Sequence, residues 1–464
     1  LSGRRLSGRP LSGRALEGRA VTAVVVLVAA AAVVGARLNA AGHDILLPFP
    51  PLIAVFRPHL GPITPVVVGI AVTGVLLGPA AAVRARWRRL LFTGYAVSLA
   101  WTVGLALVDG WHQGFVDRLT GSDEYLHDLP RMGPIGDFLA GFTGRILDFQ
   151  PDSWTTHVSS HPPLATLVFW ALDRVGLGGG TWASAVVVLI GSSAGVAVLV
   201  TLRELGAEAA ARRAAPFLVL FPGAVWVGVS ADGMFAGVVS WGIALAVRGV
   251  RRGGRGGAGL ATLGGVLLGA TLYLSYGLSL MVFPVAAVCW LAVRDRSDRA
   301  VTVRRWLWVV AGVAVVAGLF VASGFDWFEG VRVLDVRYYQ GIATTRPYSY
   351  FVWANLAAFC LSAGPAAAAG LARAVGRVWP ARVLRPRIVA RRPVVAVISL
   401  AAALSVVVAD LTGLSKAETE RIWLSFAIWV LVSTALIPRR SVRWLLAVQV
   451  LVALGINHLT LTYW

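Results

Sequence analysis

Three carboxylates stand out because each lies beside a long apolar segment. Asp123 and Glu124 are adjacent in the stretch GSDEYLHDL, and Asp232 lies in VSADGMF, between two apolar segments. A carboxylate next to a reacting hydroxyl can accept its proton, which is general-base catalysis. Taken singly, each acid is equally compatible with a plain turn or a solvated loop. The three form a candidate site only if the chain brings them to one side of a membrane.

Side chains that could bind a phosphate occur near the same segments. Arginine suits phosphate because its planar guanidinium contacts two oxygens at once. Arg421, which begins an apolar segment after KAETE, is the first candidate, followed by Arg346 in TTRPYSY; Arg131 and Arg337 are further ones. His161, in SSHPPL, could close a helix or contact the phosphate. Each arginine could instead anchor to lipid headgroups.

A divalent cation could bind Asp123, Glu124 and Asp232, because hard cations prefer carboxylates. No ligand spacing defines such a site, so we assign neither a metal ligand nor a cofactor. Cys289 and Cys360 both lie in apolar segments, which argues against a disulfide framework or a zinc site.

The composition is that of a membrane protein. The chain has 464 residues, 57% hydrophobic and 14% charged, whereas a soluble protein carries about 25% charged residues. Apolar runs near the length of about 20 residues that a spanning helix needs recur along it. The net charge of +20 comes from arginines clustered between these runs, a topology signal rather than a nucleic-acid surface. We therefore predict an all-α, polytopic transmembrane helical bundle with membrane lipids, and no nucleic acid, as partners.

We predict about 13 spans in a single domain over residues 20–464. Residues 1–19 repeat an L-S-G-R unit and are predicted to be a disordered basic cytoplasmic tail. The predicted spans are 20–38, 64–82, 90–108, 183–201, 214–230, 234–248, 258–273, 278–293, 306–323, 351–375, 394–412, 422–438 and 445–462.

The segment 162–175 is predicted not to cross the membrane. It is short for a span, a proline pair suits its first turn, and GLGGG follows it. With this segment at the outer surface, 31 of the 42 basic residues fall inside, as the positive-inside rule requires. The outer loop 109–182 is too long for a mere connector. It is the predicted catalytic loop, with interfacial helices at 162–175 and about 135–147.

The order of these motifs resembles a known family. An acidic pair precedes Tyr125 (DEYLHDL), a proline pair opens an interfacial helix (HPPLATLVFW), a further acid lies between later spans (SADGMFAGVVSW), and Arg421 lies in ETERIWLSF. This order is similar to that of GT-C glycosyltransferases, in particular the protein O-mannosyltransferase and lipid A aminoarabinose transferase group. The resemblance covers roughly residues 90–438.

The resemblance implies a membrane glycosyltransferase that uses a polyprenyl-phosphate sugar, of the arabinofuranose or mannose class, and a cell-envelope glycan, glycolipid or protein as acceptor. The phosphate is already a good leaving group, so the reaction needs a base and cationic donors. Asp123 is the first choice for the base, with Glu124 as its alternate or its orienter, and with Asp232 to orient the acceptor or to share the proton. The expected substrate-binding residues are Tyr125, Arg131, His161, Arg346 and Arg421.

Charge and composition also predict a location. Lys416 is the only lysine, which suggests a GC-rich genome such as an actinobacterium's. We expect a multi-pass protein of the bacterial plasma membrane, with a cytoplasmic N-terminus and outer catalytic loops. A transporter or flippase of lipid-linked sugars would place polar groups within broken spans, whereas the acids here gather in outer loops. A wall-polymer polymerase or ligase with a similar loop stays open.

Overall fold

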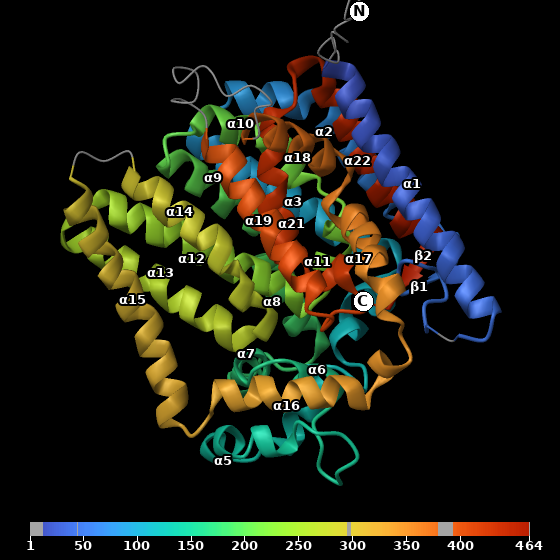
Figure 1. The fold of residues 1–464 in the computed structure, drawn as a ribbon, viewed down its shortest axis with the longest axis vertical. Coiled ribbons are helices and arrows are strands. Elements are labelled where there is room, and N and C mark those ends of the chain that lie inside the picture. Colours follow the sequence, from blue (N-terminus) through green and yellow to red (C-terminus); the bar gives the residue numbers. More distant parts are fainter. Residues whose placement is uncertain (1–12, 44, 295–297, 379–392, 464) are drawn as a thin grey trace, which may run out of the picture.

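The computed structural model describes residues 13–43, 45–294, 298–378 and 393–463, which are helical almost throughout (Figure 1). Lipid offers no hydrogen-bond partner to backbone N–H and C=O groups. An apolar segment in lipid therefore forms a helix, in which these groups bond to one another. Ten helices of the described chain are long and apolar enough to cross a membrane. They are α1 (Gly13–Ala40), α2 (Thr64–Arg84), α3 (Trp87–Val108), α8 (Gly180–Ser192) with α9 (Ala194–Glu204), α12 (Ala231–Arg252), α13 (Gly254–Leu274), η5 (Tyr276–Met281) with α14 (Val282–Arg294), α15 (Arg299–Ala322), α19 (Pro393–Leu411) and α22 (Arg439–Leu459).

The polytopic all-α fold is confirmed, but the described helices give ten spans, or eleven with one bent pair, rather than thirteen. The predicted span 351–375 consists of α17 (Tyr348–Ala363) and α18 (Pro365–Val378), whose axes are bent by 106°. The bend lies at Gly364, whose φ of +85° ends α17 in a left-handed conformation that glycine adopts without strain.

Two further predicted spans are not continuous helices. The segment 214–230 is divided into α10 (Glu208–Val219) and the short α11 (Ala224–Val227). Pro222 lies in the break and has no N–H with which to continue a helix. The segment 422–438 holds an apolar helix over Leu424–Leu436, which is shorter than a span. That helix consists of α21 (Leu424–Val430) and the 3₁₀ segment η7 (Leu431–Leu436), and the short α20 (Thr419–Ile422) precedes it.

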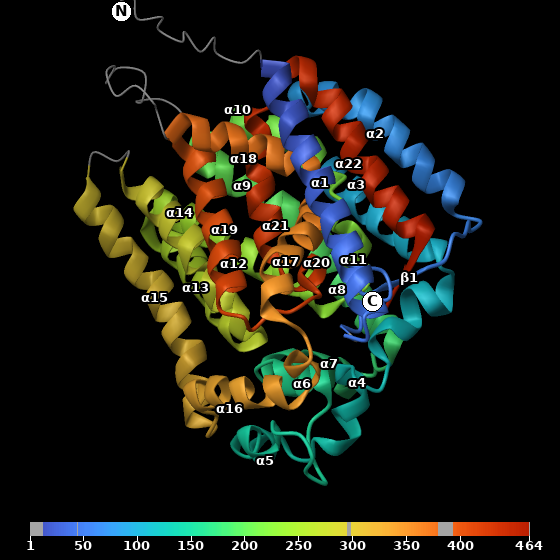
Figure 2. The same cartoon turned by 45° about the vertical axis from the view of Figure 1, so that its right-hand side comes forward.

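The segments that connect the long helices lie at two opposite ends of the bundle. Figures 1 and 2 show α5, α6, α7 and α16 together at one end, which we call the loop end, and the starts of α3 and α15 at the opposite, arginine end. These sets are the segments predicted to be outer and inner. The loop-end helices are α4 (Tyr125–Asp128), α5 (Ile135–Ala140), α6 (Thr156–Ser160), α7 (Leu164–Arg174) and α16 (Trp327–Gln340).

The two predicted interfacial helices differ in outcome. Helix α7 has 11 residues, too few to span about 30 Å of hydrocarbon at 1.5 Å per residue, as predicted for 162–175. The helix predicted near 135–147 is shorter than expected. Helix α5 has only 6 residues, and a 3₁₀ turn over Thr143–Arg145 follows it.

Helix α1 begins at Gly13, so the predicted tail 1–19 is too long at its C-terminal end; residues 1–12 lie outside the described part. The reason is Glu17, which has no exposed surface. Its carboxylate accepts hydrogen bonds from Arg373 of α18 and from Ser441 Oγ of α22, the latter at 2.9 Å. A buried ion pair therefore draws a polar stretch into the first helix.

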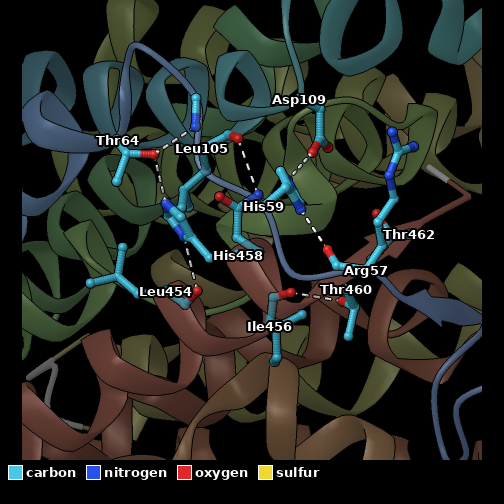
Figure 3. A network of polar contacts seen from close by, with 12 residues as sticks. Arg57, His59, Thr64, Leu105, Asp109, Leu454, Ile456, His458, Thr460 and Thr462 are labelled. Carbon is cyan, nitrogen blue, oxygen red and sulfur yellow. Dashed lines mark hydrogen bonds and ion pairs between the residues drawn. The ribbon is translucent and has the colours of Figure 1, made fainter.

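A short sheet joins segments from both halves of the chain. Strand β1 (Ala54–Phe56) pairs antiparallel with β2 (Thr460–Thr462). Figure 3 shows His59 Nε2 beside Asp109 Oδ1, at 2.6 Å. Arg118 donates to the other oxygen of Asp109 at 2.9 Å and to the backbone of β2 at 2.6 Å. This network fixes the loop before α2 against the end of α3.

We expect cysteines introduced at Asp152 and at Arg88 to react from opposite faces of a membrane. Both positions are exposed, one at the loop end and one at the arginine end. The native Cys289 and Cys360 would first be replaced with alanine. Labelling intact cells with a membrane-impermeant maleimide should modify position 152 only. Labelling of both positions from one face would contradict the predicted topology.

Candidate active site

Four segments that are distant in the sequence meet at the loop end. Glu124 precedes α4, His157 lies in α6, Asp232 lies in the first turn of α12, and Arg421 lies in α20. An acid in the first turn of a helix is favoured by the positive end of the helix dipole. Residues on four different elements therefore converge only because the bundle packs them together.

Arg421 is the centre of a buried ion network. Its Nη1 donates to Asp232 Oδ2 at 2.8 Å, and its Nη2 donates to Glu418 Oε2 at 2.6 Å. Only 4% of Arg421 is exposed. Burial alone would lower the pKa of Arg421, but the charges of Asp232 and Glu418 raise it above its ordinary value. The guanidinium is therefore permanently charged and bridges two carboxylates.

His157 extends this network to the acidic pair. Its Nδ1 lies 3.1 Å from Glu124 Oε1, and its Nε2 lies 3.3 Å from Arg421 Nη2. Burial would raise the pKa of Glu124, but the charge and hydrogen bond of His157 lower it. Burial would lower the pKa of His157, but Glu124 raises it. A continuous polar chain thus runs from Glu124 through His157 and Arg421 to Asp232.

Asp123 faces away from this network although it neighbours Glu124. Its side chain is exposed and accepts a hydrogen bond from Thr156 Oγ1 at 3.1 Å. Its backbone carbonyl accepts from the N–H of His157 at 3.0 Å. The predicted acidic pair is therefore divided, with one carboxylate at the surface and the other in the buried network.

Tyr125 and His161 pack as aromatic support for His157. Tyr125 is 1% exposed, and its ring centroid lies 5.9 Å from that of His157 and 5.7 Å from that of His161. Burial and the nearby Asp232 and Glu124 charges raise the pKa of Tyr125, which stays a phenol. Burial lowers the pKa of His161 to about 4. His161 is therefore neutral at pH 7 and could offer a hydrogen bond, but no positive charge, to a phosphate.

Arg131 and Arg346 lie outside the network and hold loops instead. Arg131 donates to Asp128 Oδ1 at 2.6 Å and to a backbone carbonyl at 2.9 Å. Arg346 donates to the carbonyls of Ile45, at 3.1 Å, and Lys416, at 2.7 Å. These placements do not favour the phosphate-binding role predicted for the two arginines, because structural acceptors already engage their guanidinium groups. Arg337 similarly pairs with Asp148, in the loop 109–182.

Glu418 reaches Arg421 from a strained turn. Ala417 and Glu418 have φ angles of +81° and +63°, which cost residues other than glycine about 1–3 kcal/mol each. Asn355 of α17 holds the turn: its Oδ1 accepts from the Ala417 N–H at 3.1 Å, and its Nδ2 donates to the Ser415 carbonyl at 2.6 Å. We call residues 415–418 the strained turn.

The sequence prediction did not select His157 or Glu418 as site residues. Helical spacing carries a weak signal for both. His157 precedes His161 by four residues, and Glu418 precedes Arg421 by three, so each pair can share a helix face. Neither spacing shows which distant residue the side chain meets.

A metal ion does not fit these carboxylates. Asp232 accepts from Arg421 and Glu124 faces His157, so cationic or hydrogen-bonding side chains fill the places that a divalent cation would take. Across the described residues, no group of three or more His, Cys, Asp and Glu side chains is suited to hold a metal ion.

An open depression lies near α4, and neither Asp123 nor Glu124 lines it. Its volume of about 710 Å³ is in the range of about 300–1,000 Å³ that ligand pockets span. It borders α4, directly after Glu124 and Tyr125, and the C-terminal end of α7. Its polar lining residues are Thr120, His127, Asp173 and Arg174.

The Glu124–His157 pair gives stability a pH dependence of known direction. The pKa of Glu124 is lowered from 4.5, and that of His157 is raised from 6.5. The Glu124 contribution is lost as pH falls through its folded pKa, and the His157 contribution as pH rises through its folded pKa. We expect the thermal midpoint of the wild type to exceed that of Glu124→Gln most between about pH 4.5 and 6.5. A difference that grows towards alkaline pH would contradict this pairing.

No protein-family model matches this chain. No curated protein matches it either. Among solved structures, it is similar to the crystal structure of the Archaeoglobus fulgidus oligosaccharyltransferase in complex with Zn and sulfate, with 17% identity and a TM-score of 0.49. The match covers 79% of this chain and 51% of that chain, so this chain spans about half the length of that protein. A likeness of this degree assigns neither a family nor an activity.

Proposed function

We propose that this protein is a membrane glycosyltransferase of the GT-C type, which transfers a sugar from a polyprenyl-phosphate carrier to an acceptor hydroxyl at the loop end. One observation carries the proposal. Residues from four distant segments form one buried ion network beside the exposed Asp123. Three of these segments, those of Glu124, Asp232 and Arg421, also belong to the motifs whose order resembles that of the GT-C family.

Asp123 is the residue that we assign as the base, because it is the accessible carboxylate of the acidic pair. It would take the proton of the acceptor hydroxyl as that oxygen attacks the anomeric carbon. The bond from that carbon to the phosphate oxygen breaks, and polyprenyl phosphate leaves with the electron pair. The N–H of His157 donates to the backbone carbonyl of Asp123 and so holds this residue next to the network, while its carboxylate stays at the surface.

Arg421 is the proposed ligand of the donor phosphate. Both of its terminal nitrogens already bind carboxylates, so a phosphate must replace one of them. Glu418 is the more exposed partner, at 28% of its side chain against 6% for Asp232. We infer that the phosphate takes the place of Glu418, while Asp232 keeps the guanidinium in position.

A transfer assay with defined donors tests this proposal. Purified protein in lipid vesicles would be given a radiolabelled arabinofuranosyl or mannosyl polyprenyl phosphate together with cell-envelope acceptor fractions. We expect label to enter an acceptor with one donor class, and Asp232→Asn to reduce transfer by on the order of tenfold to a hundredfold. Asp137→Asn, which alters an exposed acid of the loop 109–182 outside the network, is the control and should behave as the wild type. Failure of folded protein with both donor classes would refute the proposal.

Transport of a lipid-linked sugar is the second candidate, and the bent pair α17–α18 favours it, because transporters place broken helices at their binding sites. Vesicles that hold the labelled donor on one leaflet separate the two functions. Movement of the donor between leaflets without acceptor labelling would favour transport. A ladder of product lengths would instead indicate a polymerase.

A further inference from the structure

A second pocket lies at the arginine end, where the α12–α13 turn meets the start of α15. Its volume is about 300 Å³. Cationic, glycine and apolar residues form its walls, and among the described residues that line it none is acidic. The lining residues are Gly249, Gly253, Gly254, Arg255, Gly257, Ala258, Ala261, Arg305 and Trp308.

The guanidinium of Arg305 is fixed in this pocket. Its Nη1 donates to the carbonyl of Val250 at 3.1 Å. It also packs closely over Gly253: a Cβ at that residue would lie only 2.5 Å from Arg305 Cζ. Gly253 has a φ of +68°, a left-handed conformation that favours glycine. The glycine turn therefore positions the arginine against the pocket wall.

Further positive charge surrounds Arg305. Arg255 lines the pocket from the first turn of α13 and is exposed. The guanidinium of Arg252 lies over the same turn, since a Cβ at Gly256 would be 3.7 Å from its Cζ. Asp298, the N-cap of α15, accepts a hydrogen bond from the N–H of Val301 at 3.0 Å. The pocket is thus electropositive, and no carboxylate is among the described residues that line it.

Both walls change from cationic to apolar along the helices. On α13 the lining residues Arg255, Ala258 and Ala261 follow at three-residue spacing, and on α15 Trp308 follows Arg305 at the same spacing. Residues at this spacing share one helix face. Trp308 is 51% exposed, as for aromatic residues at a membrane interface. The arginines therefore lie at the end of the bundle, and the apolar residues lie one and two turns deeper.

We propose that this pocket binds an anionic phospholipid of the leaflet at the arginine end. The phosphate lies against Arg305 and Arg255, and an acyl chain runs along Trp308 and Ala261. Basic pockets between transmembrane helices bind such headgroups, and guanidinium groups contact phosphate oxygens bidentately. A soluble phosphate would use the arginines alone, whereas the apolar inner wall matches a lipid chain. This site does not depend on the proposed glycosyl transfer.

Native mass spectrometry can count the bound lipid. Protein stripped of lipid in mild detergent would be titrated with phosphatidylglycerol, and separately with phosphatidylcholine. We expect the wild type to retain phosphatidylglycerol preferentially. Arg305→Gln should reduce its occupancy by on the order of tenfold, because one charge-assisted contact is lost. Arg304→Gln is the matched control, since Arg304 is the exposed neighbour on α15 and does not line the pocket.

Three outcomes would overturn the proposal. They are equal retention by Arg305→Gln and Arg304→Gln, equal retention of phosphatidylcholine, and displacement of the lipid by millimolar glycerol 3-phosphate, which would indicate a soluble phosphate ligand. If Arg305→Gln unfolds, Arg255→Gln gives the same comparison from α13. Equal thermal midpoints of variants and wild type would exclude a folding defect.

Discussion

Asp123→Asn should lower the rate of sugar transfer by about 10²–10⁴-fold, the usual contribution of a general base. The amide keeps the size of the side chain and can still accept the hydrogen bond from Thr156, but it cannot take a proton. Because Asp123 is exposed and outside the ion network, donor binding should survive. Single-turnover rates and donor binding, measured on the same preparation, would separate the two effects.

The control for this variant is Asp152→Asn, which alters another exposed acid of the catalytic loop. It should leave both quantities unchanged. Turnover of Asp123→Asn near that of the wild type would remove Asp123 as the base. The role would then move to Glu124 or Asp232, the two buried carboxylates of the network.

Arg421→Met should destabilise the protein by on the order of 3–5 kcal/mol, the usual result of removing one partner from a buried ion pair. Asp232 and Glu418 would both lose their guanidinium partner. The loss should be smaller near pH 5 than at pH 8, because burial raises the pKa of Glu418 once the charge of Arg421 no longer lowers it, so this carboxyl can bind a proton at low pH. Thermal unfolding in detergent, followed by circular dichroism, measures it.

Arg421→Lys is the matched control, because it keeps the charge. A single ammonium cannot replace a planar group that binds Asp232 and Glu418 through different nitrogens, so stability should be intermediate between wild type and Arg421→Met. Equal stability of all three proteins would show that the network contributes little to the fold. Donor use by the lysine variant should also fall, by roughly tenfold to a hundredfold.

The sequence predicted the long helices because hydropathy over about 20 residues reports directly on lipid burial. It did not predict the breaks at Pro222 and Gly364, because the average hydropathy of a window does not change when the helical hydrogen bonding of the backbone is interrupted at one residue. Nor did it predict that Glu17 belongs to α1, because its partner Arg373 lies in another helix.

In the candidate site, too, the sequence predicted the residue types but not the contacts between them. Charge type and the order of motifs selected Glu124, Asp232 and Arg421 as site candidates. That Asp232 and Arg421 bind each other, 189 positions apart, depends on how α12 and α20 pack, which no local pattern encodes. His157 is part of the site only because its ring nitrogens lie beside Glu124 and Arg421, which are distant from it in the sequence. By contrast, Arg346 had the right chemistry in the right loop, but backbone carbonyls bind it.

The strained turn also sets a limit on how far this protein can be stabilised. Ala417 and Glu418 hold left-handed conformations that most residues avoid, so the backbone at these two residues departs from the conformation that they would prefer. Ala417→Gly would remove that strain, although the added freedom of the unfolded chain offsets part of the gain. The same change would let Glu418 swing away from Arg421. That release would weaken the Glu418–Arg421 ion pair but ease its replacement by the donor phosphate, so stability and donor binding are opposing quantities at this turn.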